Sequence, residues 1–236
     1  TKLYFSMENL ILQQFFVFTF SERHDKMCSY LYFSFLRGQT MDSNFFALIS
    51  RMRYIARWGL MRNALPENIQ EHSHMVAVLA HALGVIRRDI FHQPCDVNAL
   101  ATAALYHDAS EILTGDLPTP IKYHNAEIMS AYHAVEDLAV QKLLGMLPPE
   151  LRETYADVLA EDKDGDIYPL VKAADKLSAY IKCIEERKAG NNEFLSAEAQ
   201  TRAALEASPL PEVQYFLEHF IPAFERDLDE LGAIGQ

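Results

Sequence analysis

Residues 103–111, Ala-Ala-Leu-Tyr-His-Asp-Ala-Ser-Glu, constrain the fold most, because they place ionisable side chains in an apolar stretch. Alanine and leucine dominate the preceding residues and nothing breaks a helix, so we expect one continuous helix that ends near residue 113. Residues three and four apart share a helix face, which puts Glu111 one turn beyond His107 and Asp108. Buried charges are costly unless something pairs with them. A divalent metal ion with a hydrolytic water is one such partner.

The chain from Met41 onward consists of further helical patterns joined by short breaks. Apolar residues recur at helical spacing, and we find neither an alternating strand pattern nor an internal repeat. The expected helices cover residues 44–56, 69–88, 97–113, 126–147, 150–160, 170–188, 193–207 and 213–231. This pattern predicts an all-α fold, a bundle of roughly eight or more helices.

Local signals predict where several helices begin and which faces they bury. Asn68 followed by Glu71 predicts a capping box, in which each side chain accepts a hydrogen bond from the other residue's backbone N–H. Asp96 is a typical cap for the helix that follows it. In the helix over residues 126–147, the apolar positions expected to face inward are Ile128, Val135, Leu138, Ala139 and Met146.

Residues 1–40 differ from the rest of the chain, since they hold ten of its 26 aromatic residues and no alanine or proline. Residues 10–20 resemble the apolar region of a signal peptide, but the basic flank is weak and no small-residue cleavage site follows. We interpret residues 1–40 as an extension outside the domain, from a mis-assigned start or a cloning artefact, with Met41 as the natural initiator. The alternative is a helical arm that packs on the domain or on a partner. The domain then covers residues 41–236.

The composition argues against several classes of protein. The formal net charge of −12 argues against a nucleic-acid polymer as partner, since such a surface needs clustered lysine and arginine. Polar residues interrupt every apolar run well before the ~20 residues that a membrane span needs, so we expect no membrane association. The three cysteines are odd in number and widely spaced, which fits no disulfide framework and indicates a cytoplasmic protein.

Four residues on three predicted helices are candidate metal ligands. The order His … His-Asp … Asp, made by His72, His107, Asp108 and Asp175, resembles the HD superfamily of metal-dependent phosphohydrolases, an all-α helical bundle. Imidazole and carboxylate donors suit manganese, iron, cobalt or zinc better than calcium. Such a set leaves room for water and a phosphate oxygen, so an ion there can lower the pKa of the water and polarise the phosphoryl group.

Each of these residues also has a plainer interpretation. A His-Asp dipeptide alone is more often a satisfied pair in a core, and His72 would fit as an ordinary buried histidine. Asp175 lies beside the main apolar stripe of its helix, where a solvated carboxylate would fit as well. The four residues together, with Glu111 one turn beyond the dipeptide, favour the metal site.

Several short segments carry a closer resemblance. They are Arg57-Trp58, Leu60-Met61-Arg62, Glu71-His72-Ser73, Tyr106-His107-Asp108-Ala109-Ser110-Glu111, Leu113-Thr114-Gly115-Asp116-Leu117-Pro118-Thr119-Pro120 and Lys172-Ala173-Ala174-Asp175. Over about residues 41–231 the chain resembles the bacterial YfbR-type 5′-deoxynucleotidases, and the Gly-Asp-Leu-Pro-Thr-Pro loop is the most specific part. The resemblance implies an HD-domain phosphoric monoester hydrolase. Its substrates would be deoxyribonucleoside 5′-monophosphates, with selectivity against ribonucleotides.

The same resemblance implies a metal centre and a proton-transfer group. His72, His107, Asp108 and Asp175 would bind one divalent metal ion, with cobalt or manganese as the activator. His72, Asp108 and Asp175 would also contact the substrate. Glu111 would be the catalytic general acid/base near the attacking water.

Further roles implied by the resemblance concern the nucleotide. Arg57 would be a catalytic residue that orients the 5′-phosphate, and Trp58 would wall the sugar so that a 2′-hydroxyl fits badly. Asp116 would accept a hydrogen bond from the 3′-hydroxyl. The same site would be lined by Leu117, Pro118 and Thr119. Members of the family are homodimers, so we expect a homodimer.

From the residues alone, the roles around the substrate stay open. Arg57 would also fit as a partner of a helix C-terminus, and Trp58 as a core residue. Asp116 after Gly115 would also fit as a turn-forming aspartate. For the function, one alternative is another HD phosphohydrolase, acting on a nucleoside triphosphate, a cyclic nucleotide or an alarmone. The others are an HD-type oxygenase with a second metal and a non-catalytic nucleotide-binding regulatory module.

Overall fold

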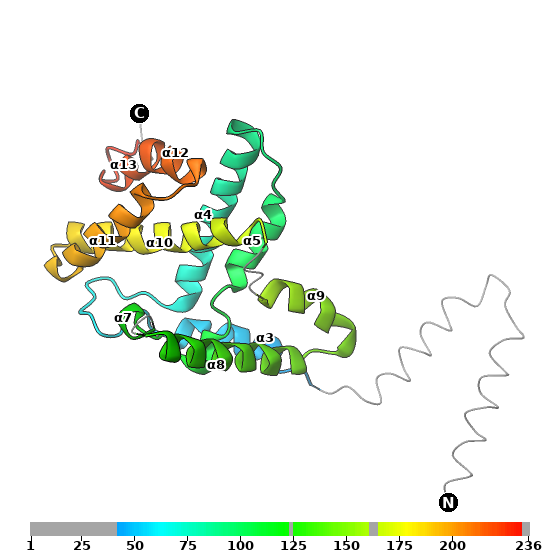
Figure 1. Ribbon diagram of the computed structural model, residues 1–236. Helices are drawn as coiled ribbons and strands as arrows, with labels where there is room; N and C mark the ends of the chain where they lie inside the picture. Colours follow the sequence, from blue (N-terminus) through cyan, green and yellow to red (C-terminus); the bar gives the residue numbers. More distant parts are fainter. Residues whose placement is uncertain (1–41, 123–124, 161–164, 233–236) are drawn as a thin grey trace, which may run out of the picture. The chain divides into compact units, whose positions relative to one another are not determined.

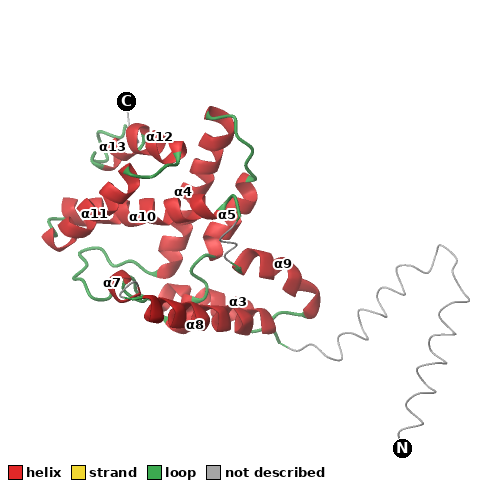
Figure 2. Cartoon of the chain, viewed as in Figure 1, coloured by secondary structure: helices red, strands yellow, loops and turns green. Residues whose placement is uncertain are grey.

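The computed structural model describes residues 42–122, 125–160 and 165–232. The chain divides into two units, residues 1–42 and 43–236, and the first lies outside the described residues apart from Asp42. The interpretation of residues 1–40 as an extension therefore stays a prediction. Every regular element of the described part is a helix, with one isolated bridge between Ala56 and Asn68 (Figure 2). The predicted all-α fold is thus confirmed.

The main core of the second unit lies where three long helices meet (Figure 1). These are α4 (Ile69–Val85), α5 (Val97–Tyr106) and α10 (Tyr168–Lys188). Each contacts the other two, and Leu83, Leu100 and Leu177 are fully buried between them. The helices that complete this core at the C-terminal side are α11 (Leu195–Glu206), α12 (Pro211–His219) and α13 (Ile221–Phe224).

A second, smaller core lies around Phe45 and Leu143, which are fully buried. Its helices are α3 (Phe45–Ile49), α8 (Ala126–Gly145) and α9 (Pro149–Leu159). The short elements of the described part are η2 (Ser50–Tyr54), η3 (Ile86–Ile90), α6 (Glu111–Thr114), α7 (Thr119–Lys122) and η4 (Asn192–Phe194). Among the described residues, none of the helices combines the length with the apolar character that crossing a membrane requires.

The predicted caps of α4 and α5 are confirmed. Asn68 Oδ1 accepts a hydrogen bond from Glu71 N at 3.0 Å, and Glu71 Oε2 accepts one from Asn68 N at 3.2 Å. Asp96 Oδ1 accepts hydrogen bonds from the backbone N–H groups of Asn98 and Ala99. These contacts satisfy N–H groups that a first helical turn leaves unpaired, so they define where both helices begin.

The continuous helix expected over residues 103–111 is wrong. α5 ends at Tyr106 and α6 begins at Glu111, and between them backbone hydrogen bonds join residues three apart instead of four. His107 Nδ1 lies 2.7 Å from the carbonyl oxygen of Ala104, which a regular helix would use for its own backbone. Because the side chain competes for this acceptor, the chain tightens into turns.

Two other predicted helices are also divided. Residues 44–56 form α3 followed by the 3₁₀ turn η2, and residues 213–231 form α12 and α13, which ends at Phe224. Pro222 explains the second division, because proline lacks the N–H that a continuous helix would bond to residue 218.

The inward face predicted for α8 is wrong at two positions. Val135 is 50% exposed and Leu138 is 62% exposed, whereas Ala139, Leu143 and Leu144 are buried. Only the C-terminal half of α8 belongs to the second core, while its earlier half contacts the short helices α6 and α7. Two single-turn helices are too short to cover the full apolar face of α8.

A buried ion pair holds the connector (residues 55–68), which links η2 to α4, against α10. Glu186 accepts hydrogen bonds from the backbone N–H groups of Ala64 and Leu65 at 2.8 and 3.0 Å. Lys182 donates to Glu186 and to the carbonyl of Leu65, and both charged residues are buried. Burial raises the pKa of Glu186, but the hydrogen bonds from Lys182, Asn191 and the connector outweigh it and lower the pKa to about 2.

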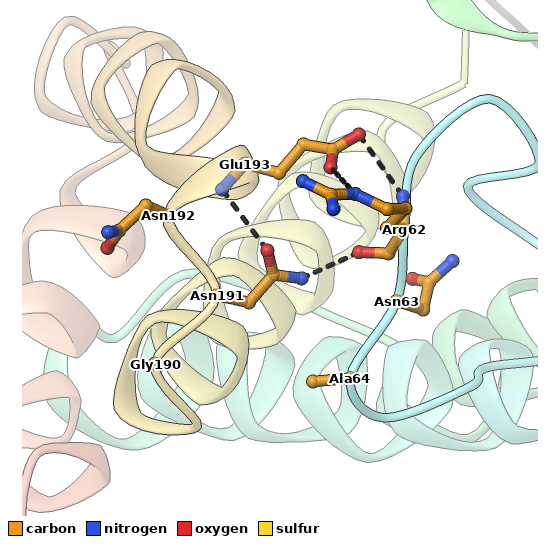
Figure 3. Close-up of a pocket in the computed structure, with 7 residues that line it drawn as sticks. All are labelled: Arg62, Asn63, Ala64, Gly190, Asn191, Asn192 and Glu193. Atoms are coloured by element: carbon orange, nitrogen blue, oxygen red, sulfur yellow. Dashed lines mark hydrogen bonds and ion pairs between the residues drawn. The ribbon is translucent and has the colours of Figure 1, made fainter.

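The connector also contacts the turn between α10 and η4 (Figure 3). Asn191 Nδ2 donates to the carbonyl of Arg62 at 2.6 Å, and Arg62 Nε donates to Glu193 Oε2 at 2.8 Å. A cavity of about 690 Å³ lies between these two segments. It is lined by Arg62, Asn63, Ala64, Gly190, Asn191, Asn192 and Glu193. Two sets of contacts therefore fix the connector along its length.

We expect Glu186→Ala to lower the free energy of unfolding by about 3–5 kcal/mol, because it leaves the buried Lys182 ammonium without its carboxylate. Urea denaturation at neutral pH measures this loss. The matched control is Glu185→Ala, which removes an exposed carboxylate from the same helix and should change stability by no more than about 0.5 kcal/mol. Equal effects of the two variants would contradict the structural importance of the buried pair.

Candidate metal centre

His72, His107, Asp108 and Asp175 come from three separate segments and meet beside the main core. His72 lies near the start of α4, His107 and Asp108 directly follow α5, and Asp175 lies on α10. His72 Nε2 is 3.1 Å from Asp175 Oδ1 and 3.6 Å from Asp108 Oδ2. His107 Nε2 is 3.1 Å from Asp108 Oδ2. The structure thus brings His72, His107 and Asp108 together, and Asp175, whose helix stripe had left its direction open, joins them through its contact with His72.

The other ring nitrogen of each histidine has its own partner. His107 Nδ1 donates to the backbone carbonyl of Ala104 at 2.7 Å, since a carbonyl can only accept. His72 Nδ1 lies 3.1 Å from Ser178 Oγ on α10. Both Nε2 atoms are buried and have no well-formed hydrogen bond with any described residue. Each histidine therefore turns its second nitrogen toward the cluster, as metal-binding histidines do.

The donor atoms and their charges fit a divalent ion. Ligand atoms of His72, His107 and Asp108 lie within 4.8 Å of one another. Among the described residues, no other three histidine, cysteine, aspartate or glutamate side chains have their ligand atoms this close together. Burial raises the pKa values of Asp108 and Asp175, but the neighbouring imidazoles outweigh burial and lower both. Two carboxylates and two imidazoles are donors that suit manganese, iron, cobalt or zinc.

Glu111 is a buried carboxyl group next to this cluster. It is 6% exposed at the start of α6, and its Oε2 has no hydrogen-bond partner among the described residues. Burial, followed by the charges of Asp108 and Asp116, raises the pKa of Glu111 to about 10. Burial and these two negative charges therefore both favour the protonated form of the Glu111 carboxyl group.

Arg57 brings a fixed positive charge to the same place. Its NH1 lies 3.5 Å from Asp108 Oδ2, and its Nε donates to Glu67 Oε2 at 3.0 Å. Burial lowers the pKa of Arg57, but the surrounding carboxylates, Asp108 first among them, raise it overall. The guanidinium is therefore charged and mostly enclosed, with 12% of its side chain exposed.

Trp58 follows Arg57 in an unusual backbone conformation. Its φ of 59° lies in the left-handed region, which is rare for a bulky residue and often marks a functional site. The backbone N–H of Trp58 donates to Asp116 Oδ2 at 3.3 Å, and Nε1 donates to Glu67 Oε2 at 3.0 Å. The indole ring packs edge-on against Phe194, with ring centroids 5.2 Å apart. Asp116 thus lies beside Trp58, and burial raises the Asp116 pKa.

The remaining candidates vary in how much the structure says of them. Leu117 and Pro118 are half-buried in the loop after Asp116, and Thr119 begins α7, so their contact with a substrate stays a prediction. Two spare histidines of α4, His74 and His81, are exposed and lie off the face that carries His72. Glu67, whose carboxylate accepts hydrogen bonds from Arg57 and Trp58, was not identified from the sequence. Glu67 lies in the connector, and no local sequence pattern there indicates these two partners.

Comparison with known proteins places this chain in a family. The description of the family model that matches residues 44–224 is 5′-deoxynucleotidase YfbR-like. The chain is 50% identical over 192 residues to the 5′-deoxynucleotidase YfbR of Shigella boydii and to that of Escherichia coli. These alignments cover 81% of this chain and 96% of each relative. The chain belongs to the YfbR-like family.

A solved structure supports the fold of this YfbR-like chain. The crystal structure of an HD-domain phosphohydrolase from Listeria innocua superposes with a TM-score of 0.69 at 25% identity. The match covers 78% of this chain and 90% of the Listeria protein. The predicted HD-domain bundle is therefore confirmed.

We expect His107→Ala to weaken Mn²⁺ binding by more than about 100-fold, beyond the loss typical of residues that only orient ligands. The measurement is titration calorimetry on the protein stripped of metal. His74→Ala is the control, because it removes an exposed imidazole from α4 and should leave binding unchanged. If both variants bind Mn²⁺ as the parent does, this cluster is not the metal site.

Proposed function

We propose that this chain is a metal-dependent 5′-deoxynucleotidase, a phosphoric monoester hydrolase that converts deoxyribonucleoside 5′-monophosphates to deoxynucleoside and phosphate. The observation that carries the proposal is the meeting of two imidazoles and two carboxylates beside Arg57 and Glu111. Relatives named 5′-deoxynucleotidase, at 50% identity over 81% of the chain, support the same activity.

The metal is the proposed cofactor. His72, His107, Asp108 and Asp175 would hold one divalent ion, and cobalt or manganese is proposed as the activator because the resemblance to the YfbR-type enzymes implies it. When bound, the ion would lower the pKa of a water molecule and polarise a phosphoryl oxygen. Three of these residues, His72, Asp108 and Asp175, would then also lie against the phosphate.

Arg57 and Glu111 are the proposed catalytic side chains. The Arg57 guanidinium would orient the 5′-phosphate and offset its charge, because its planar fork matches the geometry of phosphate oxygens. Glu111 would take a proton from the attacking water and pass it to the leaving 5′-oxygen, a role that its buried position beside the cluster supports.

Selectivity for deoxyribose is proposed to come from Trp58 and Asp116. The indole ring of Trp58 would leave too little space for a 2′-hydroxyl, and Asp116 would accept a hydrogen bond from the 3′-hydroxyl. Their contact through the Trp58 backbone N–H supports a shared role. The same sugar site would be lined by Leu117, Pro118 and Thr119.

Assembly and location are also proposals. A homodimer is supported by exposed apolar side chains on α8, such as Val135 and Leu138. A cytoplasmic location is supported by Cys95 and Cys183, which form no disulfide among the described residues. The net charge of −12 supports a small nucleotide, held at one site, over a nucleic-acid polymer.

The direct test compares phosphate release from dAMP and from AMP with added Mn²⁺ or Co²⁺. We expect the kcat/KM for dAMP to exceed that for AMP by about 10- to 100-fold, a range that one additional hydroxyl group can produce in a closed pocket. A chelator should abolish both reactions. Equal kcat/KM values would contradict the sugar selectivity, and release of tripolyphosphate from dATP would indicate a triphosphohydrolase instead.

We expect Glu111→Gln to lower kcat for dAMP by about 100-fold or more, because the amide cannot exchange a proton at neutral pH. Mn²⁺ binding should be kept, since Glu111 is not among the proposed ligands. Glu153→Gln, which changes an exposed carboxylate on α9, is the matched control and should retain full activity. Full activity of Glu111→Gln would remove the general acid/base role.

A further inference from the structure

One carboxylate oxygen in the connector contacts two residues to which the proposed function gives separate tasks. Glu67 Oε2 accepts a hydrogen bond from Arg57 Nε at 3.0 Å and another from Trp58 Nε1 at 3.0 Å. Arg57 is the proposed phosphate contact, and Trp58 is the proposed wall of the sugar site. We infer that Glu67 is a positioning residue that holds these two side chains as one unit, an inference that rests on the proposed function.

For Arg57, the contact decides which edge of the guanidinium faces the site. The guanidinium is planar and its donors have fixed directions. Because Nε is hydrogen-bonded to Glu67, the opposite edge of the guanidinium, made of NH1 and NH2, faces the cluster, where NH1 lies 3.5 Å from Asp108 Oδ2. The Arg57 and Glu67 side chains are only 12% and 16% exposed, so bulk water screens their attraction weakly. Glu67 thus presents the NH1/NH2 edge to the phosphate.

For Trp58, the same contact helps to maintain a conformation that the residue would otherwise leave. A left-handed backbone at a bulky residue persists only when the surroundings hold it. Three contacts do so here: the backbone N–H to Asp116, the indole N–H to Glu67 and the ring against Phe194. The bond from Glu67 fixes the rotation of the indole, which determines the width of the proposed sugar site.

Glu67 is itself well placed to impose this geometry. The backbone N–H of Arg57 donates to the carbonyl of Glu67 at 3.0 Å, and that of Ile69 donates to the carbonyl of Ile55 at 3.0 Å. These bonds close the connector into a loop whose middle is held on α10 by Glu186 and Lys182. The carboxylate therefore extends from a fixed backbone.

Trp58 is the single tryptophan of the chain, so its fluorescence reports on this contact without any substrate. We expect Glu67→Ala to shift the emission maximum and to increase quenching by acrylamide, because the indole loses its hydrogen bond and gains freedom. Glu67→Gln should resemble the parent, since the amide oxygen accepts the same bonds. The control is Glu185→Ala, which removes an exposed carboxylate that lines one cleft together with Glu67, and it should leave the emission unchanged. Unchanged emission in Glu67→Ala would overturn the inference.

Enzyme kinetics test whether Glu67 positions Arg57 for the phosphate and Trp58 for the sugar together. In Glu67→Ala, we expect the ratio of kcat/KM for dAMP to that for AMP to fall by about tenfold, a loss of about 1.4 kcal/mol, with a higher KM for dAMP. Glu67→Gln should recover most of the ratio, and Mn²⁺ binding should stay unchanged in both variants. A purely structural loss would lower both activities equally and leave the ratio at the parent value, which would overturn the inference.

The two proposals fail in different ways. If the parent protein releases no phosphate from dAMP, the proposed function fails, and the fluorescence of the Glu67 variants still decides whether the contact exists. If the parent is active and selective while Glu67→Ala keeps both its selectivity and its KM, the proposed function stands and the role of Glu67 is refuted.

Discussion

One carboxylate oxygen, Oδ2 of Asp108, contacts side chains from several of the segments that build the candidate site. It lies 3.1 Å from His107 Nε2, 3.6 Å from His72 Nε2 and 3.5 Å from Arg57 NH1. These contacts bring α4, the segment after α5 and the connector to one place. A carboxylate largely shielded from water is costly without partners, and these partners lower the pKa of Asp108, whose side chain is 17% exposed. The group therefore stays ionised at neutral pH, as a metal ligand must.

The turns after Tyr106 make this meeting possible. Side chains of consecutive residues point about 100° apart around a regular helix, whereas here the chain leaves α5 at Tyr106 and turns more tightly. Because the chain tightens at this point, both side chains reach His72 on α4. Glu111 then begins α6 with its carboxyl group buried in the same region. The irregular backbone thus places the side chains of His107, Asp108 and Glu111 in one region.

Sequence patterns predicted the features that depend on residues close together along the chain. The capping box at Asn68, the cap at Asp96 and the approximate extent of the long helices all follow from neighbouring residues, and the structure agrees. The four candidate ligands were identified from their types and order, although the helix expected to carry His107 is interrupted. The exposed face of α8 depends on how much of it α6 and α7 cover, and the role of Glu67 depends on how a loop closes. Neither leaves a periodic signal, because both arise from tertiary contacts.

The residues of the candidate site come from two kinds of element, the helices of the main core with their turns, and the connector. His72 and Asp175 are carried by long helices of the main core, and Asp108 by the turns between α5 and α6. Arg57, Trp58 and Glu67 belong instead to the connector, which buried contacts with α10 hold in place. Under the proposed roles, changes in the connector would alter which nucleotide fits while the residues proposed to bind the metal keep their positions. Specificity residues on a loop beside ligands on rigid helices are the arrangement in which a family can change substrates and retain its chemistry.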